Sequence, residues 1–274
     1  MREAGSRATP WNGSVRFLLL RRKGVLALRH MNVKWMLFDL DGTLLPLHNE
    51  ELFEQYIRGV IQRWAPVLPR TTPRELPAQV MAAVTAMFVN NDPARSNEEV
   101  FWAELGPRIG SSQAELRSVY DAFYKDYFPS LRSYYAPRLP GPGRAVVDAA
   151  LAQGYRIALA TNPIWPRVAI EERMAWVDLG GLPWGLVTCF EVMHACKPNP
   201  AYYHEVCRLL ECRPEECVLI GNDVEEDGSA ANVGMKVFMT TDYLINKKGR
   251  TLDPTRSGSL ADLHALLKAG PLEL

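Results

Sequence analysis

The sequence lacks three features that would each assign it to a narrow class of protein. Its five cysteines include no C-x-x-C pair and are odd in number, so zinc and a disulfide framework are both poorly supported. No apolar run approaches the roughly 20 residues of a membrane span. The formal net charge is +0 and the body of the chain is mildly acidic, which gives no basic face for nucleic acid. We therefore expect a cytoplasmic protein with reduced thiols and neither nucleic-acid nor membrane partners.

The first 33 residues differ in composition from the rest. Arginine and lysine recur there, whereas Glu3 is the single acid. Two short apolar runs, 17–20 and 25–28, are separated by the basic run 21–23, which argues against a secretory signal. We interpret 1–33 as a basic, poorly ordered extension. A mis-called start upstream of Met31 is the favoured explanation, and an organelle transit peptide is the alternative.

The feature around which the chain is organised is an apolar run that ends in two acids. Residues 35–38 are apolar and predict a buried strand, and Asp39 and Asp41 follow it with one residue between them. If the strand persists, both acids point to the same side, and Gly42 then allows a sharp turn. Adjacent carboxylates repel unless a cation lies between them. The pattern suits metal-assisted chemistry on an anion, although Asp-Gly is also a common turn pair.

The segment 46–140 predicts an all-helical insertion. Apolar residues recur at helical spacing and no convincing strand occurs between residues 45 and 140. Its aromatic side chains are interpreted as the insertion's own core. Turn-rich sequence at 137–143 predicts a hinge at its end. Helices are expected over 52–64, 78–89, 97–105 and 112–127.

From residue 144 onward, predicted strands and helices alternate. This alternation favours an α/β fold with a doubly wound, Rossmann-like parallel sheet, built from 34–45 and 141–274. Ligands bind such sheets at the carboxyl ends of the strands, where the polar clusters of this sequence fall. Strands are expected over 155–160, 186–190, 217–220 and 236–240, and helices over 144–153, 167–176, 201–210 and 260–268, with a short helix through 232.

The polar clusters that follow these strands form an ordered set: Asp39-Leu40-Asp41-Gly42-Thr43, Thr161-Asn162, Lys197-Pro198 and Gly221-Asn222-Asp223 with Asp227. The set resembles the four motifs of the haloacid dehalogenase-like hydrolase superfamily, and the insertion is similar in position to the C1-type helical cap of its phosphatases. The resemblance implies that 46–140 is a cap that closes over the site and contacts the leaving group.

The resemblance implies a role for each motif residue. Asp39 is expected to be the nucleophile that forms an aspartyl-phosphate, and Asp41 the acid and base that serves leaving group and water. Thr161 and Asn162 are expected to bind the phosphoryl group, and Lys197 to balance charge. Each residue also has an ordinary structural explanation, such as a turn or a surface lysine.

The implied cofactor is Mg²⁺, held by Asp39, by the backbone carbonyl of Asp41 and by an acid of the fourth motif. That motif departs from the usual pattern, because Asn222 stands where the family commonly has the first aspartate. We favour Asp223 as the ligand, since loss of a carboxylate weakens binding of a hard dication. Asn222 and Asp227 are the alternatives.

The reaction is suggested by position 41. Dehalogenases of this superfamily lack an acid there, because a halide needs no proton, so Asp41 favours hydrolysis of a small phosphorylated metabolite. A phosphomutase retains both acids and is one alternative. A 2-haloacid dehalogenase and a non-catalytic module that binds phosphate esters are the others.

Overall fold

A computed structural model describes residues 33–68 and 70–274 of the 274-residue chain. The predicted N-terminal extension therefore lies, apart from Val33, outside the described residues. Within them, no helix has both the length and the apolar character that crossing a bilayer requires.

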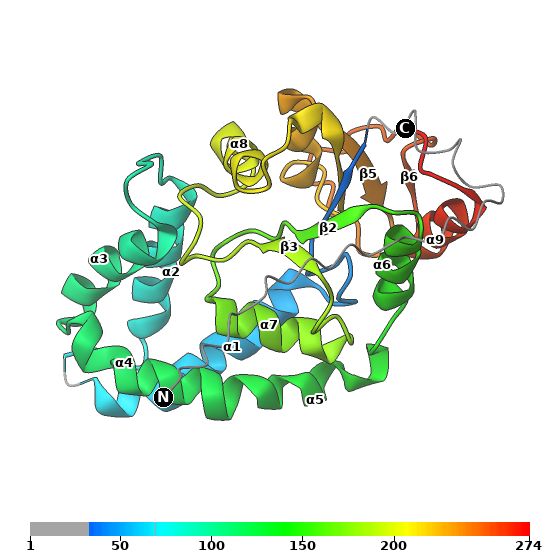
Figure 1. Cartoon of the computed structure of the whole chain (residues 1–274). Helices are drawn as coiled ribbons and strands as arrows, with labels where there is room; N and C mark the ends of the chain where they lie inside the picture. The colour runs from blue at the N-terminus through cyan, green and yellow to red at the C-terminus, as the bar shows by residue number, and fades with distance from the viewer. Residues whose placement is uncertain (1–32, 69) are drawn as a thin grey trace, which may run out of the picture. The chain divides into compact units, whose positions relative to one another are not determined.

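The described residues contain a six-stranded parallel sheet with strand order β3-β2-β1-β4-β5-β6 (Figure 1). Its central strand β1 has every residue buried, as expected for an apolar run enclosed on both faces of a parallel sheet. The predicted α/β fold is thereby confirmed. The strands are β1 Trp35–Phe38, β2 Arg156–Leu159, β3 Trp184–Val187, β4 Cys217–Gly221, β5 Lys236–Thr240 and β6 Ser257–Gly258.

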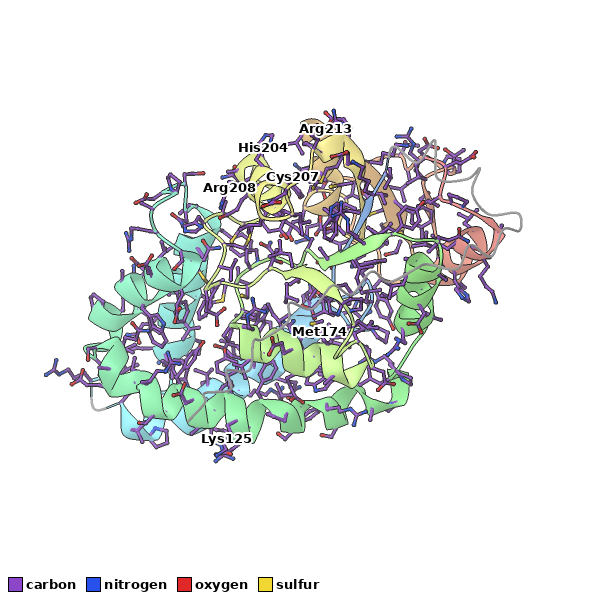
Figure 2. All side chains as sticks on the ribbon, in the orientation of Figure 1. Lys125, Met174, His204, Cys207, Arg208 and Arg213 are labelled. Atoms are coloured by element: carbon purple, nitrogen blue, oxygen red, sulfur yellow. The ribbon has the colours of Figure 1, made fainter. Side chains whose placement is uncertain are left out.

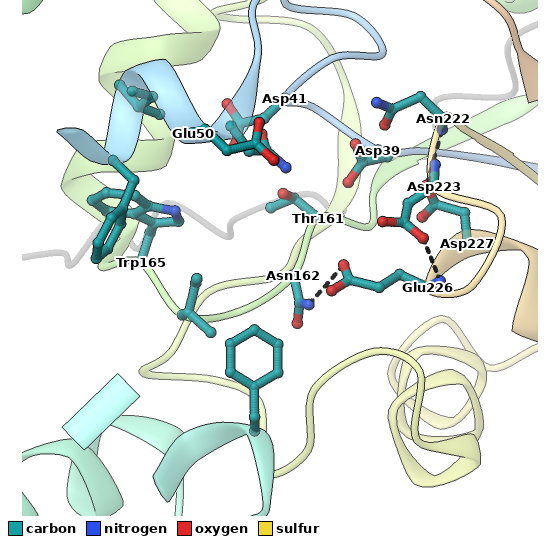
Figure 3. A pocket seen from close by; sticks show the side chains of 15 residues that line it. Asp39, Asp41, Glu50, Thr161, Asn162, Trp165, Asn222, Asp223, Glu226 and Asp227 are labelled. Carbon is teal, nitrogen blue, oxygen red and sulfur yellow. Dashed lines mark hydrogen bonds between the residues drawn. The ribbon is translucent and has the colours of Figure 1, made fainter. Parts of the chain in front are cut away.

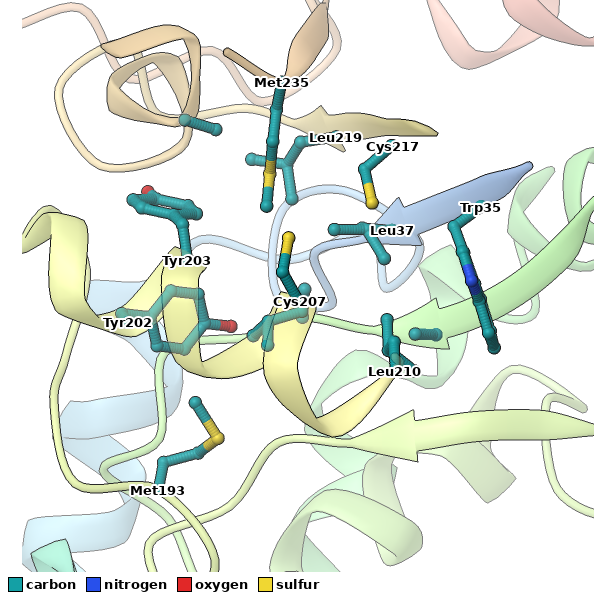
Figure 4. Close-up of a cluster of buried hydrophobic side chains, with 14 of the residues drawn as sticks. Trp35, Leu37, Met193, Tyr202, Tyr203, Cys207, Leu210, Cys217, Leu219 and Met235 are labelled. Atoms are coloured by element: carbon teal, nitrogen blue, oxygen red, sulfur yellow. The ribbon is translucent and has the colours of Figure 1, made fainter. Parts of the chain in front are cut away.

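Helices cover the two faces of the sheet. Cys207 on α8 and Met174 on α7 lie on opposite sides of β2 and β3 in Figure 2. Alternate residues of β1, Trp35 and Leu37, join the cluster beneath α8, because successive strand side chains point to opposite faces (Figure 4). The helices are α6 Gly143–Ala152, α7 Arg167–Trp176, α8 Pro200–Leu209 and α9 Leu260–Ala269, with a 3₁₀ segment at Asp227–Val233.

Two elements of the core differ from the sequence prediction. The strand expected over 186–190 is found at Trp184–Val187 instead. Its apolar sequence continues beyond the strand, but Thr188 donates its hydroxyl to the Thr161 carbonyl at 2.7 Å, and the following residues form a loop packed beside the second motif. Strand β6 was not predicted, because two small residues carry no alternating pattern.

The described residues between positions 46 and 142 form helices and turns but no strand, as predicted. The helix expected over 112–127 is interrupted, because residues Phe123–Tyr127 form a π-helical turn. The wider turn lets the consecutive aromatics Phe123 and Tyr124 both be buried. The helices are α1 Asn49–Trp64, α2 Leu76–Phe88, α3 Asn97–Ile109, α4 Gln113–Ala122 and α5 Arg132–Tyr135.

The start of α3 is bonded to the loops that follow β2 and β3. The backbone N–H of Asn97 donates to the Met193 carbonyl and that of Glu98 to the Phe190 carbonyl, both at 2.8 Å. The fully buried Asn97 amide also donates to the Pro163 carbonyl at 3.2 Å. The insertion thus contacts the loops that carry the second and third motifs. Its predicted bounds as a cap, 46–140, stay a prediction.

Candidate active site

The register of the sheet brings three strand ends together. Phe38 pairs with Leu159 of β2 on one side and with Ile220 of β4 on the other. Residues that follow these strands therefore meet at one edge of the sheet, although the first and last of them are far apart in sequence. The residues of the first, second and fourth motifs line one pocket there, and Lys197 of the third contacts two of them.

Asp39 is buried at the bottom of this pocket. One of its oxygens accepts a hydrogen bond from Lys197 Nζ at 3.0 Å, and the other accepts one from the Thr43 hydroxyl at 3.2 Å. Burial raises the pKa of Asp39 to about 7; Lys197 acts to lower it, and the carboxylates of Asp227 and Asp41 act to raise it. The carboxyl group thus lies in an acidic setting whose effect one lysine partly offsets.

Lys197 is only 1% exposed, so the alternative of a solvated surface lysine is wrong. Its ammonium bridges Asp39 at 3.0 Å and Asp227 at 2.6 Å. Burial acts to lower the pKa of Lys197, but the two carboxylates outweigh it and hold that pKa well above its ordinary value. A buried cation with two acids around it stays charged and in a fixed place.

Asp227 fixes the loop that follows β4. Its second oxygen accepts hydrogen bonds from the backbone N–H groups of Asn222 at 2.9 Å and Asp223 at 3.0 Å. A Cβ on Gly221 would lie 2.2 Å from the Asp227 carboxyl carbon, so the close approach requires glycine. Both oxygens of Asp227 are thus engaged by protein donors, one by Lys197 and the other by the backbone of the loop.

Asn222 lies against the first motif. Its amide oxygen lies 3.1 Å from the Thr43 hydroxyl, whose single hydrogen is shared with Asp39, and its amide nitrogen donates to the Tyr243 carbonyl at 2.7 Å. Gly42 has a φ of +78°, and a Cβ there would lie 2.4 Å from the Asn222 amide nitrogen. Asn222 therefore packs over the turn after Asp41.

Asp223 has one oxygen engaged and one available. Oδ1 accepts from the backbone N–H groups of Glu225 and Glu226, both at 2.8 Å, an arrangement that holds the loop. The half-buried carboxylate lines the pocket, and burial, together with Asp227, raises its pKa (Figure 3). The expected ligand choice, Asp223 over Asn222 and Asp227, stays a prediction.

Asp41 forms an ion pair that sequence reasoning missed. Its Oδ2 accepts from Nη1 of Arg173, a fully buried residue of α7, whereas Oδ1 is buried with no partner among the described residues. The guanidinium also lies 4.9 Å from the centre of the Trp165 ring. The signal in the sequence was a charge on the buried face of α7, between Ala169, Ile170 and Met174.

The two residues of the second motif have different surroundings. The Thr161 side chain points into the pocket near Asp39 and Asp41 (Figure 3). Asn162 braces neighbouring loops, since its oxygen accepts from the Lys197 N–H at 3.2 Å and its nitrogen donates to Glu226 at 2.9 Å. Burial raises the pKa of Glu226 to about 7. Glu226 was not among the predicted residues, because acids there also suit a helix start.

The pocket has a volume of about 280 Å³ and a surplus of carboxylates. None of the described residues that line it is a lysine or arginine; from outside that lining, Lys197 contacts Asp39 and Asp227, and Arg173 contacts Asp41. Hard carboxylate oxygens that have few protein cations beside them are the kind of donors that Mg²⁺ prefers. The residues present therefore fit the expected metal. The lining acids are Asp39, Asp41, Glu50, Asp223, Glu226 and Asp227.

A second group of possible metal ligands lies elsewhere. The sulfurs of Cys207, Cys212 and Cys217 all lie within 4.8 Å of one another, and the pair formed by Cys212 and Cys217 is 3.4 Å apart. Their spacing in sequence does not show this, since α8 and β4 bring them together. Cys217 begins β4, whereas the acid-lined pocket lies beyond its end. The group takes no part in the pocket.

Fold and pocket define an α/β protein with an acid-lined site at the carboxyl edge of a parallel sheet. A family model described as haloacid dehalogenase-like hydrolase matches residues 33–234. The chain belongs to this family of hydrolases.

One curated relative and two solved structures were compared with the chain. A phosphoglycolate phosphatase of Psychrobacter arcticus is 30% identical over 135 residues, which are 46% of this chain and 56% of the relative. The match thus spans little more than half the relative's length.

The solved structures resemble the chain in fold. The HAD phosphatase from Thermococcus onnurineus has a TM-score of 0.52 at 18% identity, covering 87% of this chain and 99% of its own. An L-2-haloacid dehalogenase from Xanthobacter autotrophicus has a TM-score of 0.47 at 15% identity, and the match covers 86% of this chain and 98% of the dehalogenase chain. The likeness to the Thermococcus structure, at 18% identity, shows the fold alone.

Proposed function

We propose that the chain is a Mg²⁺-dependent phosphatase that hydrolyses a small-molecule phosphomonoester through an aspartyl-phosphate on Asp39. The observation that carries the proposal is the pair of aspartates at the end of β1. Asp39 is held by Lys197 and Thr43, and Asp41 keeps one oxygen without a protein partner in the same pocket. The partial match to a phosphoglycolate phosphatase agrees with it.

In the first step, an Asp39 oxygen attacks phosphorus as the bond from phosphorus to the leaving oxygen breaks. Asp41 donates its proton to that oxygen, so the leaving group departs as a neutral alcohol. In the second step, Asp41 takes a proton from water, which attacks phosphorus and releases inorganic phosphate and the free Asp39 carboxylate. The proton on Asp41 is restored, and the cycle closes.

Other residues hold these two in place. Lys197 keeps Asp39 oriented and adds positive charge beside the transferring group. Thr161 is positioned to donate its hydroxyl to a phosphoryl oxygen, and Asn162 positions Lys197 through its backbone. Arg173 fixes one oxygen of Asp41, which leaves Oδ1 as the atom that moves protons.

Asp39, the Asp41 carbonyl and the free Asp223 oxygen are the groups that would hold Mg²⁺. When bound, the ion offsets the repulsion between the carboxylates of the pocket and a phosphate dianion. The proposal rests on the donor set described above.

The test is phosphate release from a broad panel of phosphomonoesters, including p-nitrophenyl phosphate, with Mg²⁺ and with a chelator. We expect turnover that requires Mg²⁺ and a burst of one alcohol per enzyme if breakdown of the aspartyl-phosphate is slow. Interconversion of sugar phosphates without release would indicate a mutase. Chloride release from a haloacid without metal would indicate a dehalogenase, and binding without turnover a non-catalytic module.

A further inference from the structure

The pocket has two different ends. At the sheet edge lie the acids and amides described above. The opposite end is formed by α1, α2 and the loop after β2, and its side chains are largely apolar. Figure 3 shows Trp165 there, across the pocket from Asp223 and Glu226. The apolar lining residues are Leu52, Phe53, Phe88, Ile164 and Trp165.

This apolar end is not filled by its own side chains. Phe88, at the C-terminal end of α2, is 37% exposed although it lines the pocket, whereas Trp165 is 8% exposed and fixed against Tyr56 with ring centres 4.8 Å apart. A partly exposed phenyl group beside a buried indole offers apolar contact to a ligand.

The apolar wall continues into a small recess that shares Phe53, Ile164 and Trp165 with the pocket. Tyr120 also lines the recess, and its hydroxyl is buried without a hydrogen-bond partner among the described residues. Its volume is about 10 Å³, room for little more than one small group. The polar group without a partner at this recess, the Tyr120 phenol, carries no charge.

The charges that line the pocket are all negative. Glu50, at the start of α1, is an exposed acid at the opposite end from the sheet edge, and no described lining residue is a lysine or arginine. A leaving group with a carboxylate would meet apolar and acidic surface and no cation, and juxtaposed like charges are unfavourable. An apolar leaving group would remove aromatic surface from water.

We infer that the phosphomonoester taken by this site has an uncharged, apolar leaving group, such as an aromatic or branched aliphatic alcohol, and that esters with an acidic leaving group are discriminated against. The inference rests on the proposed phosphatase function and narrows its substrate. Phosphoglycolate, the substrate in the name of the partial relative, belongs to the disfavoured class.

The experiment compares benzyl phosphate with 2-phosphoglycolate and phosphoethanolamine, three esters of primary alcohols that differ in the charge on the leaving group. We expect kcat/KM for benzyl phosphate to exceed that for phosphoglycolate at least about tenfold, because one unfavourable charge contact has a cost of this order. Equal or higher kcat/KM for phosphoglycolate would overturn the inference, and so would a preference for phosphoethanolamine, which would show selection of a cation.

Two variants locate the selectivity. Phe88→Ala should lower kcat/KM for benzyl phosphate about tenfold and leave phosphoglycolate unchanged, since apolar contact of this size gives roughly 10–200-fold discrimination. Glu50→Gln should raise the ratio of kcat/KM for phosphoglycolate to kcat/KM for benzyl phosphate a few-fold. The controls are Val89→Ala, the exposed next residue, and Glu54→Gln, one turn further along α1; neither lines the pocket.

The failures can be told apart. If p-nitrophenyl phosphate and all three esters remain intact with Mg²⁺, the proposed phosphatase function is wrong. Two results would contradict only the inference about the leaving group. In the first, p-nitrophenyl phosphate is hydrolysed but kcat/KM for benzyl phosphate does not exceed kcat/KM for phosphoglycolate. In the second, Phe88→Ala lowers kcat/KM equally for all substrates.

Discussion

The two ends of the pocket are built by different means. At the sheet edge, side chains hold one another: Lys197 bridges two carboxylates, and Asp227 accepts two backbone N–H groups in addition. At the opposite end, Phe88 and Glu50 are exposed on helices. In the proposed function, the chemistry would depend on a connected network of side chains, and selectivity on single exposed side chains. Substitutions at the two ends test this comparison.

The largest effect is expected from Asp39→Asn. An amide is a poor nucleophile, so turnover should fall by about 10⁴-fold or more, as it does when a nucleophile is removed from other enzymes. Phosphate release measures it, and the circular dichroism spectrum should stay that of the parent. Asp148→Asn, on the surface of α6, is the control. Substantial turnover by the Asp39 variant would mean that another group attacks phosphorus.

Arg173→Met tests whether Asp41 needs its buried partner. Removal of the guanidinium leaves the buried Asp41 carboxylate unpaired, which should lower the free energy of unfolding by about 3–5 kcal/mol. If Asp41 protonates the leaving group, misplacing it should slow esters of poor leaving groups more than p-nitrophenyl phosphate, whose leaving group needs no proton.

The readout for Arg173 is the ratio of kcat values for benzyl and p-nitrophenyl phosphate, which a purely structural role would not alter. Arg173→Lys, which keeps the charge, should restore part of the ratio. Arg167→Met, an exposed position on the same helix, is the control. An unchanged ratio in Arg173→Met would show that the ion pair serves stability alone.

A smaller effect is expected from the fourth motif. Asp223→Asn should raise the Mg²⁺ concentration needed for half-maximal activity by about 10–100-fold, the range seen when metal-site partners are lost. Asn222→Asp should change it less, because the Asn222 oxygen already lies within hydrogen-bond distance of the Thr43 hydroxyl. Titration of activity with Mg²⁺ measures both. Greater sensitivity at Asn222 than at Asp223 would reverse the choice of ligand.

The smallest effects should come from helix caps far from the pocket. Ser112 is the N-cap residue of α4 in the insertion, and Ser259 is the N-cap residue of α9 in the core. Each forms a complete capping box. Replacing either by alanine should cost about 1 kcal/mol of unfolding free energy and leave kcat/KM unchanged. Denaturant unfolding measures the loss. Separate transitions for the two variants would show that insertion and core unfold independently.

Much of the core could be predicted from the sequence because its signals are local. The apolar run before Asp39 specifies a buried strand, and α7 was predicted with its observed bounds because its ends are marked by Pro166 and by the end of the apolar pattern. Meeting of the motifs at one edge follows from the parallel order of strands.

What could not be predicted depends on contacts between distant residues. Arg173 lies 132 positions from Asp41, and only the fold brings this residue of α7 to the turn that follows β1. The cysteine group arises in the same way, from α8 and β4. No sequence pattern predicts that the Asn162 side chain hydrogen-bonds both the Lys197 backbone and the Glu226 carboxylate. Such pairings belong to the folded state and leave no periodic signal.

The hydrogen bonds at the start of α3 have a consequence for motion. A cap joined to a core only where the chain enters and leaves it can rotate about the line through those two points. Asn97 and Glu98 add a third point of attachment, bonded to carbonyls of Pro163, Phe190 and Met193. A swing of the whole insertion away from these loops would therefore require the hydrogen bonds of Asn97 and Glu98 to break.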